Sequence, residues 1–176
     1  MYKPLKLIFI FIATTMGNTM KSPCLVDTPY GPVLGSLRYT SSSTPYYSFQ
    51  GIPYASPPID NLRLLPPIPP SHWSSPLDLT GDSDIMCPQL SETVSGDLLG
   101  QEDCLYINVY TPTIQKQGQS NDSVPVLVWL YGGGFVTGSG RMIEYGPEKW
   151  LDEGIIVVTV NYRGIMTHLF WLSFII

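Results

Sequence analysis

Three consecutive glycines close to the end of an apolar run are the clearest chemical feature of this sequence. The run Val126–Leu130 consists of Val, Leu and Trp, and Gly132, Gly133 and Gly134 follow one residue later. Because glycine has no Cβ, such a turn can leave backbone N–H groups open toward a ligand. Two N–H groups at the end of a buried strand can stabilise a developing oxyanion. We therefore expect an oxyanion-binding loop, although a tight turn without a chemical role would have the same composition.

The groups that would complete such a site are not found in the sequence. Acyl transfer also requires a nucleophile, a general base and an acid that orients the base. There is no Gly-x-Ser-x-Gly sequence, and Ser139, between Gly138 and Gly140, has the wrong spacing for that motif. His72 lies in a proline-rich loop and His168 in an aberrant tail, so we expect neither to act as a base. We predict neither a nucleophile nor a base in this chain.

Composition excludes several other kinds of site. The 176 residues carry a net charge of −5 without a basic block, which argues against nucleic acid as a partner. Hydrophobic residues make up 44% and charged residues 13%, as expected for a folded domain and not for a disordered chain. No His and Cys cluster has metal-ligand spacing, and the glycines lack the Lys-Ser/Thr of a phosphate loop. We expect neither a metal nor a cofactor.

The N-terminal residues have the layout of a secretory signal peptide. Lys3 and Lys6 precede an apolar run over residues 7–13, and small residues follow up to Gly17. We expect a signal peptide over residues 1–20 with cleavage near Gly17, and hence a secreted protein. The apolar run is too short for a stable membrane span. An N-terminal membrane anchor or a misassigned start codon are the alternatives.

Secretion determines how the cysteines are interpreted. In an oxidising compartment Cys87 and Cys104 are the natural disulfide pair, which leaves Cys24 free or bonded outside this chain. In a reducing compartment all three would be free thiols. Asn121 begins an Asn-Asp-Ser glycosylation sequon, which is consistent with secretion.

Apolar runs separated by Pro and Gly predict short strands and one short helix. The runs at 126–130 and 155–160 are continuous enough to be covered on both faces, and a strand, helix and strand in succession favour a parallel pair. We expect the strand at 155–160 to lie in mid-sheet. A strand bearing the nucleophile would pair beside it, and without that strand an unpaired apolar edge remains. Such an edge predicts self-association. The predicted strands are Val26–Thr28, Val33–Tyr39, Tyr46–Phe49, Leu105–Thr111, Val126–Leu130 and Ile155–Val160, and the helix is Pro147–Gly154.

Several short segments of this sequence form a recognisable series of motifs: Tyr30–Gly35, Phe49–Ala55, Pro57-Pro58, Leu62–Leu64, Cys87–Gln89, Glu102–Tyr110, Gly132–Phe135 and Val160–Arg163. In these motifs and their order the chain resembles the N-terminal part of the type-B carboxylesterases, the family of cholinesterases and juvenile-hormone esterases. The resemblance implies an α/β class and a partial α/β-hydrolase fold over residues 21–163, with the N-terminal strands and first crossover of the central sheet but without the nucleophile elbow. A divergent apolar tail follows over residues 164–176.

The resemblance also implies roles for particular residues. The N–H groups of Gly133 and Gly134 would form the oxyanion hole, with Gly132 as the bend before them. Two side-chain pairs are implied as well, the first disulfide of the family and an ion pair close to it that could act as a buried clamp. These pairs are Cys87 with Cys104 and Arg63 with Glu102.

The activity implied by the resemblance is hydrolysis of small-molecule carboxylic esters through an acyl-serine intermediate in a longer parent protein. We expect the given chain to be inactive by itself. The segment Pro88–Asp103 contains no aromatic residue that could stack on a cation, which disfavours choline esters. The alternatives are a non-catalytic, cholinesterase-like adhesion or binding module, and a small secreted protein built from this segment alone.

Overall fold

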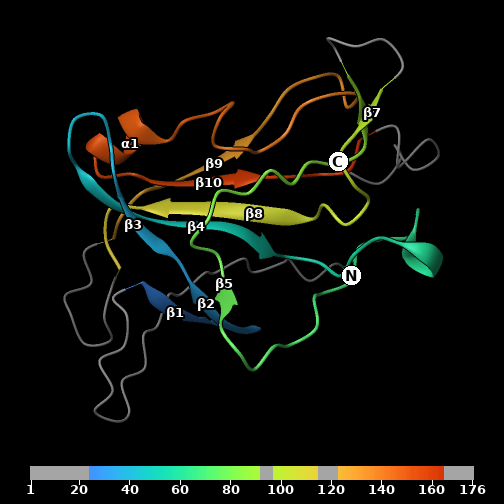
Figure 1. The fold of residues 1–176 in the computed structure, drawn as a ribbon, viewed down its shortest axis with the longest axis horizontal. Coiled ribbons are helices and arrows are strands. Elements are labelled where there is room, and N and C mark those ends of the chain that lie inside the picture. Colours follow the sequence, from blue (N-terminus) through green and yellow to red (C-terminus); the bar gives the residue numbers. More distant parts are fainter. Residues whose placement is uncertain (1–23, 92–96, 115–122, 165–176) are drawn as a thin grey trace.

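A five-stranded mixed sheet organises the protein in the computed structural model, which describes residues 24–91, 97–114 and 123–164 (Figure 1). The strand order is β3-β4-β8-β10-β9. Neighbours are antiparallel except β9 and β10, which are parallel, so the predicted parallel pair is confirmed. The bounds are β3 Ser36–Tyr39, β4 Pro45–Pro53, β8 Tyr106–Thr111, β9 Val126–Leu130 and β10 Ile156–Val160.

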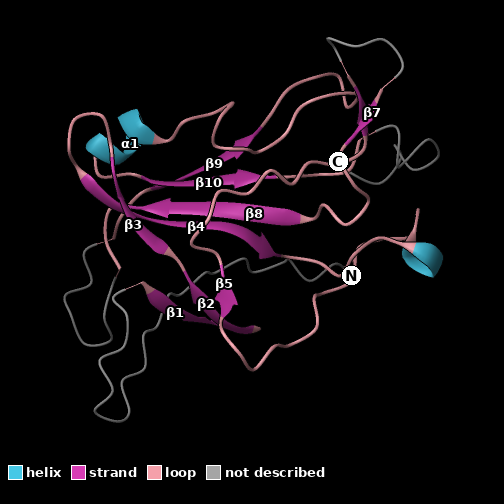
Figure 2. Ribbon diagram, in the orientation of Figure 1, coloured by secondary structure: helices cyan, strands magenta, loops and turns pink. Residues whose placement is uncertain are grey.

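One face of this sheet is covered by a second, three-stranded sheet of order β1-β2-β5 (Figure 2). It comprises β1 Leu25–Thr28, β2 Gly31–Leu34 and β5 Leu77–Asp78. The two sheets meet in an apolar core, because alternate residues of β4, β8 and β10 point to the same face. That core consists of Val26, Val33, Phe49, Ile52, Ile107, Val109 and Val158.

The opposite face of the large sheet carries the crossover helix and several polar side chains. The helix α1, Glu148–Asp152, lies between β9 and β10 in sequence and falls within the predicted helix. Its buried Leu151 packs with Tyr46, Tyr110 and Val157. This face also presents the buried Asn108 and Thr159, which are paired across β8 and β10.

The predicted strand Val33–Tyr39 is divided in the structure. Its first part, β2, belongs to the small sheet and its second part, β3, to the large one, with Gly35 between them. A Cβ on Gly35 would lie 2.5 Å from the carbonyl oxygen of Ser48 and 2.6 Å from the Phe49 ring. The chain therefore changes sheets where only glycine allows the backbone to approach β4 this closely.

The expectation that β9 is covered on both faces is wrong for the described residues. Val126, Val128 and Leu130 are 56%, 54% and 63% exposed. The apolar core between the two sheets includes Val158 of β10 but no residue of β9. The prediction that the unpaired edge lies beside β10 is also wrong, because β10 pairs with β8 and β9, which leaves β9 outermost.

The remaining described elements are short. A 3₁₀ helix spans Asp60–Leu62, and β6 (Gln89–Leu90) pairs with β7 (Leu98–Leu99). No helix among residues 24–91, 97–114 and 123–164 is long and apolar enough to cross a membrane. The expected signal peptide over 1–20, the sequon residue Asn121 and the tail from residue 165, which includes His168, lie outside the described residues.

Candidate oxyanion site

The glycine loop begins one residue after β9 and forms a tight, exposed turn. The N–H groups of Val136 and Thr137 both donate to the carbonyl oxygen of Gly133, at 3.0 and 3.2 Å. Gly133 has a φ of 131°, and a Cβ there would lie 2.1 Å from the carbonyl oxygen of Thr137. Glycine is therefore required at this position of the turn, as expected for a loop in which the backbone supplies the chemistry.

The two N–H groups singled out in the sequence are available in this turn. Gly133 and Gly134 are exposed, and within the described part of the chain neither N–H group donates a hydrogen bond. A Cβ on Gly134 would have no neighbour within 4 Å, so the space beside it is open. Two adjacent N–H groups that have no other acceptor can donate hydrogen bonds to a negatively charged oxygen.

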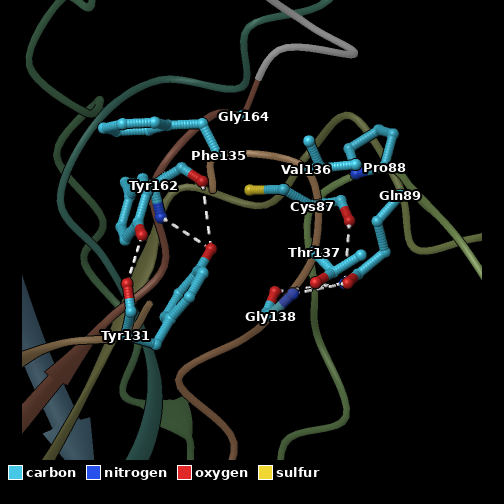
Figure 3. A pocket seen from close by; sticks show the side chains of 10 residues that line it. All are labelled: Cys87, Pro88, Gln89, Tyr131, Phe135, Val136, Thr137, Gly138, Tyr162 and Gly164. Carbon is cyan, nitrogen blue, oxygen red and sulfur yellow. Dashed lines mark hydrogen bonds between the residues drawn. The ribbon is translucent and has the colours of Figure 1, made fainter. Parts of the chain in front are cut away.

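Two tyrosines are stacked beside the loop (Figure 3), Tyr131 directly after β9 and Tyr162 two residues after β10. The rings of Tyr131 and Tyr162 lie 4.3 Å apart at an interplanar angle of 18°. Each hydroxyl donates to the backbone carbonyl oxygen of the other residue. The distance from the Tyr131 hydroxyl oxygen to the Tyr162 carbonyl oxygen is 3.1 Å. Burial raises the pKa of Tyr131 to about 12, so its hydroxyl remains a donor at neutral pH. Because β9 and β10 are parallel, their carboxyl ends meet at one edge, where this pair fixes their spacing.

Phe135 adds strain and one further contact to the loop. Its φ of 62° is unusual for an aromatic residue, and strain of this kind is found mostly where the surrounding structure enforces it. The Phe135 ring meets Tyr162 edge-on at 6.1 Å. A Cβ on Gly164 would lie 2.4 Å from the carbonyl oxygen of Phe135. The loop therefore rests on the residues that follow β10.

The segment after the loop is anchored to the polar face of the large sheet through Gly140. The side-chain oxygen of Asn161 accepts from the Gly140 N–H at 2.8 Å. The Gly140 carbonyl accepts from Asn108 Nδ2 at 2.8 Å and from Thr159 Oγ1 at 2.5 Å. All three side chains are buried, which makes their satisfied hydrogen bonds costly to lose. Sequence analysis missed these supports, although Asn108 and Asn161 lie in segments that carry the family resemblance.

Gln89 lies on the other side of the loop and pairs with the backbone of Gly138 (Figure 3). Between the loop, the tyrosine pair and Cys87 is a hollow of about 10 Å³. This volume is close to the minimum for a single water molecule, and it is too small for an ester. The described residues therefore provide two exposed backbone N–H groups and their supports, and the hollow is not a substrate pocket.

The disulfide predicted between Cys87 and Cys104 is present, and both sulfurs are buried with Ala55 and Leu105. Cys24 is a free and buried cysteine. Burial raises the pKa of its thiol, which keeps it protonated and unreactive at neutral pH. The prediction of a paired Cys87 and Cys104 with Cys24 left over is thus confirmed.

Arg63 and Glu102 face each other with two hydrogen bonds, Nε–Oε1 at 2.5 Å and Nη2–Oε2 at 2.7 Å. These bonds lower the pKa of Glu102. The side chains are 50% and 35% exposed, so the pair is not buried as expected for a clamp. Both residues lie in surface loops of the described chain, where water competes for the two charges.

Ser139 and His72, the serine and histidine candidates within the described residues, do not form a nucleophile–base pair. Ser139 is fully buried, and its hydroxyl donates to Glu144 at 2.8 Å and accepts from Arg141 Nε at 3.0 Å. His72 is exposed and contacts the ring of Tyr30 at 5.3 Å. Ser139 is therefore a structural residue beside an ion pair. No group of three or more His, Cys, Asp or Glu residues that could hold a metal occurs among the described residues.

Comparison with known proteins places these features in a wider context. Residues 22–170 match the family described as the carboxylesterase family. Juvenile hormone esterase of Tribolium castaneum is 41% identical over 140 residues, which are 79% of this chain and 23% of that protein. Esterase E4 of Myzus persicae is 35% identical over 157 residues, or 89% of this chain and 28% of that protein.

Solved structures show the same similarity. Juvenile hormone esterase from Manduca sexta superposes with a TM-score of 0.68 at 33% identity, covering 81% of this chain and 27% of that one. A carboxylesterase from Geobacillus stearothermophilus gives a TM-score of 0.65 at 31% identity, covering 80% of this chain and 26% of that one. The chain therefore spans about a quarter of the length of the relatives and structures that it matches.

Proposed function

The chain belongs to the carboxylesterase family, and from this premise we propose that it forms the oxyanion-binding part of a carboxylic ester hydrolase. The observation that carries the proposal is that the N–H groups of Gly133 and Gly134, at the carboxyl end of a sheet strand, are exposed and donate no hydrogen bond among the described residues. Donors at this position would act on the substrate's carbonyl oxygen when it becomes negatively charged.

In the proposed reaction, a serine oxygen attacks the ester carbonyl carbon while a base removes the serine proton. The carbonyl oxygen takes up the negative charge and accepts hydrogen bonds from Gly133 and Gly134, while the alcohol leaves with a proton from the base. Water then attacks the acyl-serine in the same way and releases the acid. Removing one donor of such a hole typically lowers kcat by about 10²–10³.

The proposed substrates are small-molecule carboxylic esters. Choline esters are disfavoured, because the loop closed by the Cys87–Cys104 disulfide has no aromatic side chain for a quaternary ammonium group. We also propose a secreted protein with glycosylation at Asn121. The disulfide supports this proposal, since such bonds persist in oxidising compartments.

We further propose that the 176-residue chain alone does not hydrolyse esters. Ser139 is buried against Glu144 and Arg141, and His72 contacts Tyr30 instead of a serine. A nucleophile and base would then come from residues outside this sequence. Because those outside residues would also complete the active site, the small hollow beside the loop need not hold a substrate.

The proposal is tested by sequencing transcripts of the locus beyond the codon for Arg163 and expressing both the 176-residue chain and any longer product. Each protein is treated with a serine-directed fluorophosphonate and assayed with p-nitrophenyl acetate. We expect labelling and hydrolysis from the longer product alone. Covalent labelling of the 176-residue chain would refute its proposed inactivity. A longer product with glycine in place of the nucleophilic serine, and without hydrolysis, would favour the adhesion or binding module.

A further inference from the structure

We propose that Gln89 is a positioning residue that holds the glycine loop in shape through the backbone of Gly138. The consequence for catalysis rests on the proposed function of Gly133 and Gly134, whereas the structural role of Gln89 does not. Gln89 begins β6, two residues after the disulfide-bonded Cys87, and it is 8% exposed. A buried amide side chain next to a covalent anchor is a rigid support for another segment.

The contact between Gln89 and Gly138 uses both polar atoms of the amide. Oε1 accepts from the Gly138 N–H at 2.7 Å, and Nε2 donates to the Gly138 carbonyl at 3.1 Å. Nε2 also reaches the carbonyl oxygen of Cys87 at 3.4 Å. The amide therefore pairs with one residue in the way that a neighbouring strand would. The amides of Asn and Gln offer a donor and an acceptor side by side in one plane, and Gln has the greater reach.

Gly138 lies directly against the start of the loop, so a restraint on Gly138 also restrains the start of the loop. Its φ is 114°, and a Cβ there would lie 2.5 Å from Cδ2 of Tyr131 and 2.8 Å from the carbonyl oxygen of Gly132. The backbone of Gly138 thus packs directly on the residue that opens the loop. Fixing Gly138 therefore fixes both ends of the turn that carries Gly133 and Gly134.

The other restraints on the turn are its internal hydrogen bonds and the contacts of Phe135 with the residues that follow β10. Its described hydrogen bonds at Gly133 are the internal ones from Val136 and Thr137. The Gly140 anchor lies two residues beyond Gly138 and holds the segment that follows the turn. Through these side-chain hydrogen bonds, Gln89 ties the end of the turn to a different segment, 49 residues away in the sequence.

Amide hydrogen exchange measured by NMR on the full 176-residue chain tests the proposal. The variants are Gln89→Ala, which removes both bonds, and Gln89→Glu, which keeps the acceptor and loses the donor. Gln101→Ala is the matched control, because Gln101 is an exposed glutamine in the same disulfide loop whose amide donates to Asp103.

We expect the Gly138 amide to exchange about tenfold faster in Gln89→Ala, with a smaller increase in Gln89→Glu. The amides of β10 should be unchanged in both variants, and Gln101→Ala should match the wild type throughout. An unchanged Gly138 amide in Gln89→Ala would overturn the proposal. A uniform increase that includes β10 would also overturn it, because Gln89 would then stabilise the whole fold and not the loop.

A longer product that hydrolyses esters gives a second readout. There, Gln89→Ala should lower kcat by about tenfold and leave KM almost unchanged, since the loop acts on the developing charge and not on the bound ester. A change in KM alone would contradict the positioning role. Absence of hydrolysis together with the expected exchange pattern would count against the proposed function and leave the role of Gln89 intact.

Discussion

Substituting alanine for Gly138 should destabilise the protein by about 2–4 kcal/mol, for two separable reasons. The φ of 114° is strained for any L side chain, which costs about 1–3 kcal/mol. The added Cβ would also lie 2.5 Å from the Tyr131 ring and 2.8 Å from the Gly132 carbonyl oxygen, and overpacking of this kind costs about 1–3 kcal/mol. Movement of the Tyr131 ring would relieve part of the second cost.

Two other glycines separate these causes. Gly134 has a φ of 61° but open space around its Cβ position, so Gly134→Ala should cost about 1 kcal/mol through the backbone alone. Gly146 has open space and no positive φ, so Gly146→Ala should be neutral or stabilising by up to about 1 kcal/mol. The expected order of stability is therefore Gly146→Ala, then Gly134→Ala, then Gly138→Ala.

The free energy of unfolding is measured for each variant by urea denaturation followed by tryptophan fluorescence. The slope of the transition must be the same in all variants for the comparison to report stability. If Gly138→Ala were as stable as Gly146→Ala, the argument that Gly138 closes the loop against Gly132 would be refuted. Equal losses for Gly138→Ala and Gly134→Ala would show that the close contacts contribute nothing.

Three further predictions concern the disulfide, the surface ion pair and the open sheet edge. Replacing Cys87 and Cys104 with serine should lower the free energy of unfolding by about 3 kcal/mol, measured by urea denaturation, because their bond closes a loop of sequence separation 17. Arg63→Gln should raise the pKa of Glu102 toward its ordinary value of 4.5 in an NMR titration, because Arg63 hydrogen bonds lower it. The wild-type pair should stabilise the fold at neutral pH and lose this effect as the pH falls through the lowered pKa. Val128→Lys on the outermost strand should increase the monomer fraction in sedimentation velocity, because a charge on an exposed edge strand opposes strand pairing.

Each of these predictions has a control. Reductant should destabilise the wild type and leave the double serine variant unaffected. High salt should reduce the effect of Arg63→Gln, since exposed charges are screened. Ile143→Lys places the same charge on a side chain that is 84% exposed but lies outside β9. Equal monomer fractions for the lysine variants at 128 and 143 would show that the β9 edge is not the associating surface.

Local patterns in the sequence were sufficient for most elements. The β-branched run at Ile156–Val160 and the Pro-to-Gly span around α1 are confirmed because strand and helix formation depend mainly on neighbouring residues. The parallel pairing of β9 and β10 follows from the crossover between them. The cysteine pair was predictable because the secretory layout and the family motifs both indicated it.

The position of each strand in the sheet was not predictable from such patterns. An apolar run indicates burial without indicating what covers it. Among the described strands β9 is outermost, and the core between the two sheets reaches β10 but includes no residue of β9. The exposure of the Arg63–Glu102 pair likewise depends on how two distant surface loops meet. Sequence spacing also did not reveal that Gly35 moves the chain from one sheet to the other.

The sequence by itself determined where this protein can offer backbone donors, because the freedom of three glycines after a strand is a property of those residues alone. Only the tertiary structure decided what holds the donors in place. The amides of Gln89 and Asn161 reach Gly138 and Gly140 across 49 and 21 residues of chain. Hydrogen bonds require distances within a few tenths of an ångström, and the folded sheet sets those distances between segments whose local sequence carries no record of them.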